Sequence, residues 1–150
     1  MTARTRILGV DYGSVRVGLA VSDAECKIAS PLETYERQGP ERDSGFFRSV
    51  VEREEIGAIV VGLPIHLSGR EGQKAAEARA FGKWLAEKTS LPVAFADERF
   101  TTVEAEYALW EAGMTHAKRK ARRDRVAAQM LLQAYLDAGC PKDPPGLLDG

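Results

Sequence analysis

Three acidic residues lie at positions where secondary-structure elements are expected to begin or end. Asp11 follows the apolar run of residues 7–10, and Glu98 follows a second run at residues 93–96. Asp124 lies in a basic stretch, at the expected start of an amphipathic helix. A carboxylate next to a hydrophobic core is costly to bury unless it is paired or bound to a metal. Three carboxylates that converge beside lysines and arginines therefore indicate divalent cations and a polyanionic substrate.

Each acid also has an alternative structural role. Asp11 precedes a turn, where Asp side chains often accept hydrogen bonds from nearby backbone N–H groups. Asp97 and Glu98 are adjacent, so on a strand they point to opposite faces, and either could instead pair with Arg99. The alternation does not decide which of these two acids faces a shared site. Asp124 could interact with the helix dipole rather than with a ligand.

The basic stretch at residues 118–125 contains six cations and one acid, a local charge of +5 in a chain whose net charge is −1. Cations at the start of a helix oppose the helix dipole, so helix stability does not explain them. Contact with phosphate groups does, because nucleic acids bind to local basic patches. The expected phosphate-binding residues are Lys118, Arg119, Lys120, Arg122 and Arg123, and Arg16 and Arg99, which are near two of the acids, are further candidates.

The composition is that of an ordinary globular domain, with 44% hydrophobic and 29% charged residues in 150. We expect one domain over residues 1–140 and a disordered tail, rich in Pro and Gly, over 141–150. No apolar run approaches a membrane span, and no signal peptide is evident, so a cytoplasmic protein without membrane contact is expected. Two cysteines and two distant histidines argue against a zinc site.

Hydrophobic periodicity predicts the elements that must position these acids. The expected order is βββαβαβαα, with the first two strands forming a hairpin, and it indicates a mixed sheet flanked by helices. The expected strands cover residues 6–12, 15–22, 28–35, 56–62 and 91–98, and the expected helices cover 42–55, 73–88, 101–113 and 121–138. The polar loop at 63–72 is a candidate mobile segment over the site.

Four segments carry a resemblance to a known family. They are Gly9–Ala20 (GVDYGSVRVGLA), Val60–Pro64 (VVGLP), Asp97–Thr102 (DERFTT) and Asp124–Ala128 (DRVAA). In this order, over about residues 5–138, they resemble the YqgF family, also called RuvX, of the RNase H-like superfamily. The resemblance implies an α/β fold, an RNase H-like five-stranded mixed sheet in which the first strand is central and the second is antiparallel to it.

The resemblance also implies an acidic nuclease site that uses Mg²⁺ or Mn²⁺. It places the catalytic and metal-binding carboxylates on Asp11, Glu98 and Asp124, which selects Glu98 over Asp97. Many members of the superfamily carry a further acid at the end of the fourth strand, whereas here that strand ends in Gly62-Leu63-Pro64. A site with three carboxylates is expected to bind metal modestly.

The function implied by the resemblance is hydrolysis of phosphodiester bonds, with processing of the 5′ end of pre-16S rRNA in ribosome biogenesis as the favoured role. The partner would then be RNA in a pre-ribosomal particle. One alternative is a Holliday junction resolvase acting on branched DNA, and another is a non-catalytic RNA-binding or transcription factor on a nuclease scaffold.

A monomer or a weak homodimer is expected, and a dimer would favour the junction, where two symmetric cuts need two sites. Related hairpins bind phosphate in sugar-kinase and actin-type ATPases, but those need two lobes.

Overall fold

Five strands form one mixed sheet in the computed structural model, which describes residues 6–64, 72–97 and 115–141. The strands are β1 (Arg6–Asp11), β2 (Arg16–Ser22), β3 (Ala29–Glu36), β4 (Ile56–Leu63) and β5 (Val93–Asp97), in the spatial order β3-β2-β1-β4-β5. The β1–β2 and β2–β3 pairs are antiparallel, whereas β1–β4 and β4–β5 are parallel. The predicted mixed sheet, with a central first strand and an antiparallel second strand, is confirmed.

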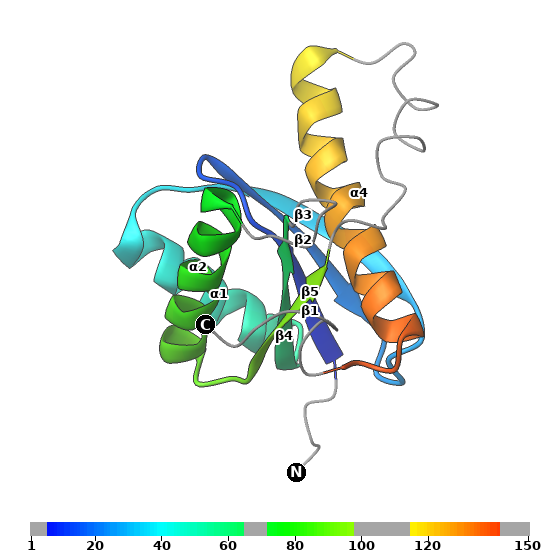
Figure 1. Cartoon of the computed structure of the whole chain (residues 1–150). Helices are drawn as coiled ribbons and strands as arrows, with labels where there is room; N and C mark the ends of the chain where they lie inside the picture. The colour runs from blue at the N-terminus through cyan, green and yellow to red at the C-terminus, as the bar shows by residue number, and fades with distance from the viewer. Residues whose placement is uncertain (1–5, 65–71, 98–114, 142–150) are drawn as a thin grey trace.

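Helices cover both faces of this sheet (Figure 1). Helices α1 (Pro40–Arg53) and α2 (Gln73–Thr89) lie on one face, and α4 (His116–Asp137) crosses the other. Pro40 occupies the first turn of α1, where its missing N–H is no loss. Among the described residues, no helix combines the length and the apolar composition that a membrane span requires. The helix expected at 101–113, most of the 63–72 loop and the tail at 142–150 lie outside the described residues.

The two faces of the sheet are packed with side chains of different size. Toward α1 and α2, large residues such as Leu8, Leu19 and Phe47 are fully buried in the larger core. Toward α4, the buried strand residues include the small Ala20, and Ala128 of the helix is itself fully buried. Small residues on both partners allow α4 to approach the sheet closely.

Two glycines mark the points of closest approach between α4 and the sheet. A Cβ atom on Gly18 of β2 would lie 1.9 Å from the carbonyl oxygen of Asp124, and one on Gly9 of β1 would lie 2.8 Å from Cβ of Leu132. Real Cβ atoms do not come this close to other heavy atoms. The backbone of α4 therefore rests directly on the β1–β2 hairpin, and glycine inside a strand is the sequence signal of such an approach.

Side-chain amides fix the position of α4 along the sheet. The Nε2 group of Gln129 donates to the Ala29 carbonyl (3.1 Å), and Oε1 of Gln133 accepts from the Ala29 N–H (2.9 Å). The Nε2 group of Gln133 also donates to the Lys27 carbonyl (2.9 Å). These bonds connect the helix to the start of β3, so α4 is held both by packing and by directional contacts.

Helix α4 begins earlier than the periodicity predicts. It starts at His116 rather than near Ala121, because the Thr115 side chain caps it by accepting a hydrogen bond from the Lys118 N–H (3.3 Å). The basic stretch thus lies within the helix. Asp124 is well beyond the first turn, where the dipole effect has faded, so the dipole interpretation of Asp124 is wrong.

The start of β2 also differs from the prediction. The alternation of the sequence predicts Val15 inside the strand, but β2 begins at Arg16 and Val15 is 58% exposed. The Val15 carbonyl instead accepts a hydrogen bond from the Arg37 N–H (2.9 Å). The turn after β1 is therefore tied to the end of β3.

We expect the Gly18→Ala substitution to lower the free energy of unfolding by about 1–3 kcal/mol, since the added methyl group overpacks the contact with α4. Gly45→Ala, at an exposed position of α1 with open space around it, is the matched control. It should raise stability by about 0.5–1 kcal/mol, because alanine favours a helix over glycine. Urea denaturation of both variants measures the difference, and equal effects would contradict the close contact.

Candidate active site

The carboxyl ends of the three parallel strands β1, β4 and β5 lie at the same edge of the sheet. The N-terminal half of α4 extends beyond this edge (Figure 1), so the helix and the strand ends border a common region. Binding groups in open α/β sheets gather at the carboxyl ends of the strands. This edge is therefore where the predicted site residues should be found.

Asp11 and Asp124 are brought together at this edge. Asp11 is paired across the sheet with Gly18, and Gly18 lies directly beneath the Asp124 backbone. Directly opposite residues of an antiparallel pair are about 4.5–5.5 Å apart at Cα and share a face. Asp11 therefore lies on the α4 face of the sheet, next to the point where Asp124 crosses it. Both carboxylate residues are half-buried.

Arg16 belongs to the same cluster. Its Nε donates to Oδ2 of Asp124 at 2.9 Å, and the two side chains retain 34% and 22% exposure. An ion pair this open to solvent contributes at most about 1 kcal/mol to stability. The pair is thus better understood as an arrangement of charge at the site than as a support of the fold.

The face that each acid of β5 can occupy follows from the register. Asp97 is paired with the buried Leu63, and Phe95 of the same alternation packs into the core beneath α1 and α2. Asp97 thus lies on the face opposite Asp11. Ala94 and Ala96 pack on the α4 side. Glu98 and Arg99, which the sequence also singled out, lie outside the described residues.

The donor atoms at this edge suit hard cations. Strand β4 ends at the buried Leu63 and adds no acid, as the sequence indicated. Within residues 6–64, 72–97 and 115–141, no group of three or more His, Cys, Asp or Glu side chains could hold a metal. The carboxylates of Asp11 and Asp124 are two hard oxygen ligands, which match Mg²⁺ or Mn²⁺ and need a further carboxylate to complete a site.

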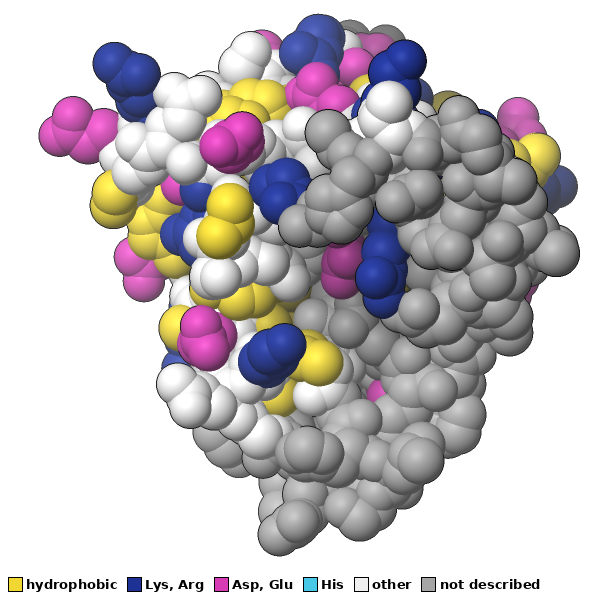
Figure 2. Space-filling view, turned by 90° about the horizontal axis from the view of Figure 1, so that it is seen from above, with side chains coloured by type: hydrophobic (Ala, Val, Ile, Leu, Met, Phe, Trp, Pro, Cys, Tyr) yellow, Lys and Arg dark blue, Asp and Glu magenta, His cyan; other side chains and the backbone are white. Residues whose placement is uncertain are grey.

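The predicted phosphate-binding residues of the basic stretch lie on the first part of α4, which extends beyond the strand ends. Lys118 and Arg123 are exposed, and Arg122 is half-exposed. Arg119 and Lys120 belong to the same helix. Viewed from above this edge, Figure 2 shows basic and acidic side chains interspersed on the described surface. The helix thus places positive charge beside the two carboxylates.

A second polar cluster, which the sequence reasoning missed, supports the other face of the same edge. Asp43 is only 1% exposed and accepts hydrogen bonds from the Tyr35 hydroxyl (2.8 Å) and the Gln38 N–H (2.8 Å). It also pairs with Nε of Arg37 (3.3 Å). An acid in the first turn of a helix is the signal that could have revealed it, through the rules of N-terminal capping.

The two ionisable partners in this cluster titrate abnormally. Burial by itself would raise the pKa of Asp43, but the bonds from Gln38, Tyr35 and Arg37 outweigh it and hold the pKa below its ordinary value. Burial and the bond to Asp43 raise the pKa of Tyr35 to about 12. The folded protein therefore favours an ionised Asp43 and a neutral Tyr35.

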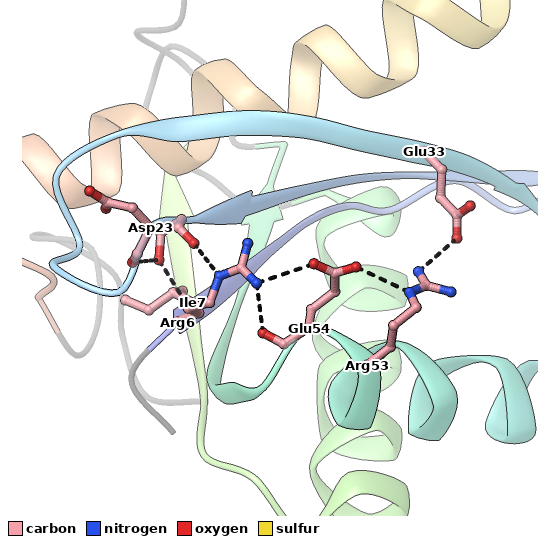
Figure 3. Close-up of polar contacts among 7 residues, drawn as sticks. Arg6, Ile7, Asp23, Glu33, Arg53 and Glu54 are labelled. Carbon is pink, nitrogen blue, oxygen red and sulfur yellow. Dashed lines mark hydrogen bonds and ion pairs between the residues drawn. The ribbon is translucent and has the colours of Figure 1, made fainter. Parts of the chain in front are cut away.

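A further group of hydrogen bonds and ion pairs lies at the opposite end of the sheet, away from the candidate site (Figure 3). Arg6 donates from Nε to the Ser22 carbonyl (2.9 Å) and from an Nη to the Glu54 carbonyl (3.0 Å) and carboxylate (3.2 Å). Glu54 also pairs with Arg53, whose guanidinium lies 3.7 Å from Glu33. These contacts connect the start of β1 to the end of α1 and have a structural role.

Solved structures share this architecture. The structure of Thermus thermophilus RuvC in complex with a Holliday junction substrate gives a TM-score of 0.58 at 19% identity, covering 92% of this chain and 98% of that one. A fowlpox virus resolvase with Holliday junction DNA gives 0.54 at 10% identity, covering 91% and 99%. The protein has the RNase H-like fold of these resolvases.

Sequence comparison defines the family. Residues 5–138 match the RuvX family, described as Holliday junction resolvase. Two relatives are named as candidate pre-16S rRNA nucleases. The one from Rhodopirellula baltica is 46% identical over 136 residues, covering 91% of this chain and 79% of that protein. The one from Koribacter versatilis is 44% identical over 141 residues, covering 93% and 92%. The chain belongs to the RuvX family, and it is a hydrolase of phosphodiester bonds.

The Asp43 cluster predicts a dependence of stability on pH. Because the folded-state pKa of Asp43 lies below the ordinary 3.8, its contribution is present above about pH 4 and is lost as pH falls through the folded-state value. We expect Asp43→Asn to cost about 2 kcal/mol at pH 7 and clearly less at pH 3. Glu41→Gln, an exposed acid in the same helical turn, should change stability by less than about 0.5 kcal/mol. Denaturation at both pH values measures this, and a cost of Asp43→Asn that does not depend on pH would contradict the role assigned to its ionised form.

Proposed function

We propose that the protein is a metal-dependent nuclease that processes the 5′ end of pre-16S rRNA in the cytoplasm, during ribosome biogenesis. The observation that carries the proposal is the contact of the Asp124 backbone with Gly18, the partner of Asp11 in the sheet. This contact holds two carboxylates at one strand end, beside a basic helix. The names of the two relatives, at 46% and 44% identity, support RNA as the substrate.

In this proposal Asp11, Glu98 and Asp124 are the metal ligands and catalytic residues. Bound Mg²⁺ or Mn²⁺ supplies activation of a water and stabilisation of the leaving 3′ oxygen. Asp11 and Asp124 keep their carboxylates in place because β1 and α4 are rigid elements in direct contact. Glu98 is preferred over Asp97 because the register places Asp97 on the opposite face.

The cations of the site have two roles in the proposal. The cations of the basic stretch bind backbone phosphates on either side of the cut, which positions the strand without reading its sequence. They are Lys118, Arg119, Lys120, Arg122 and Arg123. Two further arginines contact the scissile phosphate. Arg16 pairs with Asp124 in the structure, and Arg99 follows Glu98 in the sequence. When substrate enters, the Arg16 guanidinium can share its donors between Asp124 and a phosphate oxygen.

A Holliday junction is the second candidate substrate. The description of the family and the titles of the two solved structures favour it, since both titles name a resolvase in complex with a Holliday junction. Resolution of a junction requires two symmetric cuts and therefore two copies of the chain. Cleavage of a 5′-extended 16S rRNA precursor compared with a four-way DNA junction, at the same Mn²⁺ concentration, distinguishes the two, and cleavage of the junction alone would overturn the RNA proposal.

We expect Asp11→Asn and Asp124→Asn to reduce the cleavage rate by about 100-fold or more, because a carboxylate that binds metal is lost while the shape of the side chain is kept. Glu25→Gln, an exposed acid in the β2–β3 turn at the other end of the sheet, should leave the rate unchanged. Single-turnover cleavage of the precursor RNA measures the rates. Full activity of either aspartate variant would remove that residue from the site.

The basic helix should dominate the salt dependence of binding. We expect Lys118→Gln to reduce the slope of log affinity against log salt by about 0.7, the contribution of one phosphate contact with a single strand. Lys27→Gln makes the same charge change at an exposed position at the far end of the molecule. Its slope should equal that of the parent protein. Filter binding of RNA to the Asp11→Asn protein at several salt concentrations gives both slopes, and equal slopes would argue against this phosphate contact.

A further inference from the structure

A pocket of about 310 Å³ lies on the α2 side of the sheet edge, on the face opposite the proposed active site. Its lining includes Tyr12, Arg37, Pro40, Glu77, Phe81 and Trp84. We refer to it as the Trp84 pocket. Its volume is at the small end of the range for ligand sites, which fits one base with its sugar rather than a larger molecule.

Aromatic rings form the walls of the Trp84 pocket. Phe81 and Trp84 are stacked, with ring centroids 5.5 Å apart at 24°, and Tyr12 packs on Phe81 at 5.0 Å. Phe81 is buried, whereas Tyr12 and Trp84 retain partial exposure. Such a surface favours a flat, apolar ring system, because stacked aromatic groups gain both burial and favourable ring geometry.

The polar groups of the pocket are arranged for a neutral ligand. The Arg37 guanidinium lies over the rings of Tyr12 (5.6 Å) and Phe81 (5.2 Å) and is held there by the buried Asp43. Because Asp43 balances its charge, and Glu77 adds an exposed carboxylate, a phosphate group is not the favoured occupant. The favoured occupant is a nucleobase, since Arg binds the acceptor edge of a base and Glu accepts a hydrogen bond from an exocyclic amino group.

The connection to the active site is direct. Tyr12 follows Asp11, and alternation along the chain directs the two side chains to opposite faces of the same sheet edge. The ring of Tyr12 packs on Phe81 of α2, whereas Asp11 lies beneath α4. A strand that crosses the edge with a phosphate at Asp11 therefore also passes Tyr12, which lines the Trp84 pocket.

We propose that the Trp84 pocket binds an unpaired nucleobase of the RNA strand beside the scissile phosphate. This inference rests on the proposed nuclease function and makes its substrate more specific, because a base within a duplex is stacked and paired and does not enter a pocket of this kind. The enzyme then selects single-stranded RNA at the cleavage position. Aromatic stacking supplies the affinity, and it tolerates different bases.

Binding to the Asp11→Asn protein tests the proposal without requiring cleavage. The probes are a short single-stranded RNA, the same RNA with one abasic position, and the fully paired duplex. Trp84→Leu should weaken binding of the single strand by about 5- to 150-fold, the loss expected for one base–aromatic stack, and change duplex binding by less than about twofold. Trp84→Phe, which keeps a ring, should retain most of the affinity.

A second variant separates the pocket from the packing of Trp84 in the core. Ala80 is exposed and lines the pocket, so Ala80→Leu obstructs it without removing a core contact. Ala76→Leu, at an exposed position one turn earlier on α2 and outside the lining, is the matched control. We expect Ala80→Leu to weaken single-strand binding at least fivefold and Ala76→Leu to leave it unchanged.

The abasic probe completes the design. In the Asp11→Asn protein, one abasic position should cost as much affinity as the Trp84→Leu substitution does. When Trp84→Leu is added to that protein, the abasic position should cost nothing further. Equal loss of single-strand and duplex binding, or full affinity of both Trp84→Leu and Ala80→Leu, would overturn the pocket. Cleavage is measured separately, with the protein that retains Asp11. Cleavage by that protein together with a failed binding test would leave the nuclease proposal standing, whereas selective base binding without cleavage by that protein would support the pocket and count against the nuclease.

Discussion

Helix α4 lies so close to strands β1 and β2 that Gly9 and Gly18 beneath it have no room for a side chain. Close backbone contact leaves little freedom to slide or tilt, and the bonds of Gln129 and Gln133 to the start of β3 remove more of it. The position of Asp124 over the end of β1 follows from this contact. So does the direction in which the first half of α4, with its cations, extends beyond the sheet.

Residues at this edge of the sheet contribute side chains to both faces. Parallel pairing of β1 with β4 and of β4 with β5 brings three carboxyl ends together, and alternation then divides their side chains between two sides. Asp11 and Gly9 belong to the α4 side, where packing is tight and charged groups lie near the surface. Tyr12 belongs to the α2 side, where Arg37 and the buried Asp43 stabilise an aromatic pocket. A nucleic-acid strand that crosses the edge would contact both.

The choice between the two candidate substrates, precursor rRNA and a four-way DNA junction, depends on the shape of the nucleic acid that the site accepts. Hydrolysis of a phosphodiester needs the same carboxylates in RNA and in DNA, so the acidic site does not separate them. In our proposal the surroundings of the site separate the two substrates, since an unpaired strand exposes base faces whereas a four-way junction offers mainly paired arms. The aromatic walls of the Trp84 pocket favour the first, and the resolvase fold by itself favours neither.

Local hydrophobic patterns and motifs within short segments were enough to predict the strands and helices that the structure describes, the mixed sheet, and the position of Asp11 at a strand end. The helix predicted at 101–113 lies outside the described residues. The start of α4 was missed although Thr115 signals it, since charges outnumber apolar residues in the first turns of that helix. The tertiary structure was needed to show that the Asp124 backbone rests on Gly18 beside Asp11, that Asp97 lies on the other face, and that Arg37 joins Tyr12 and Trp84 in a pocket. Each of these depends on contacts between segments far apart in the chain, which the pattern along any one segment does not contain.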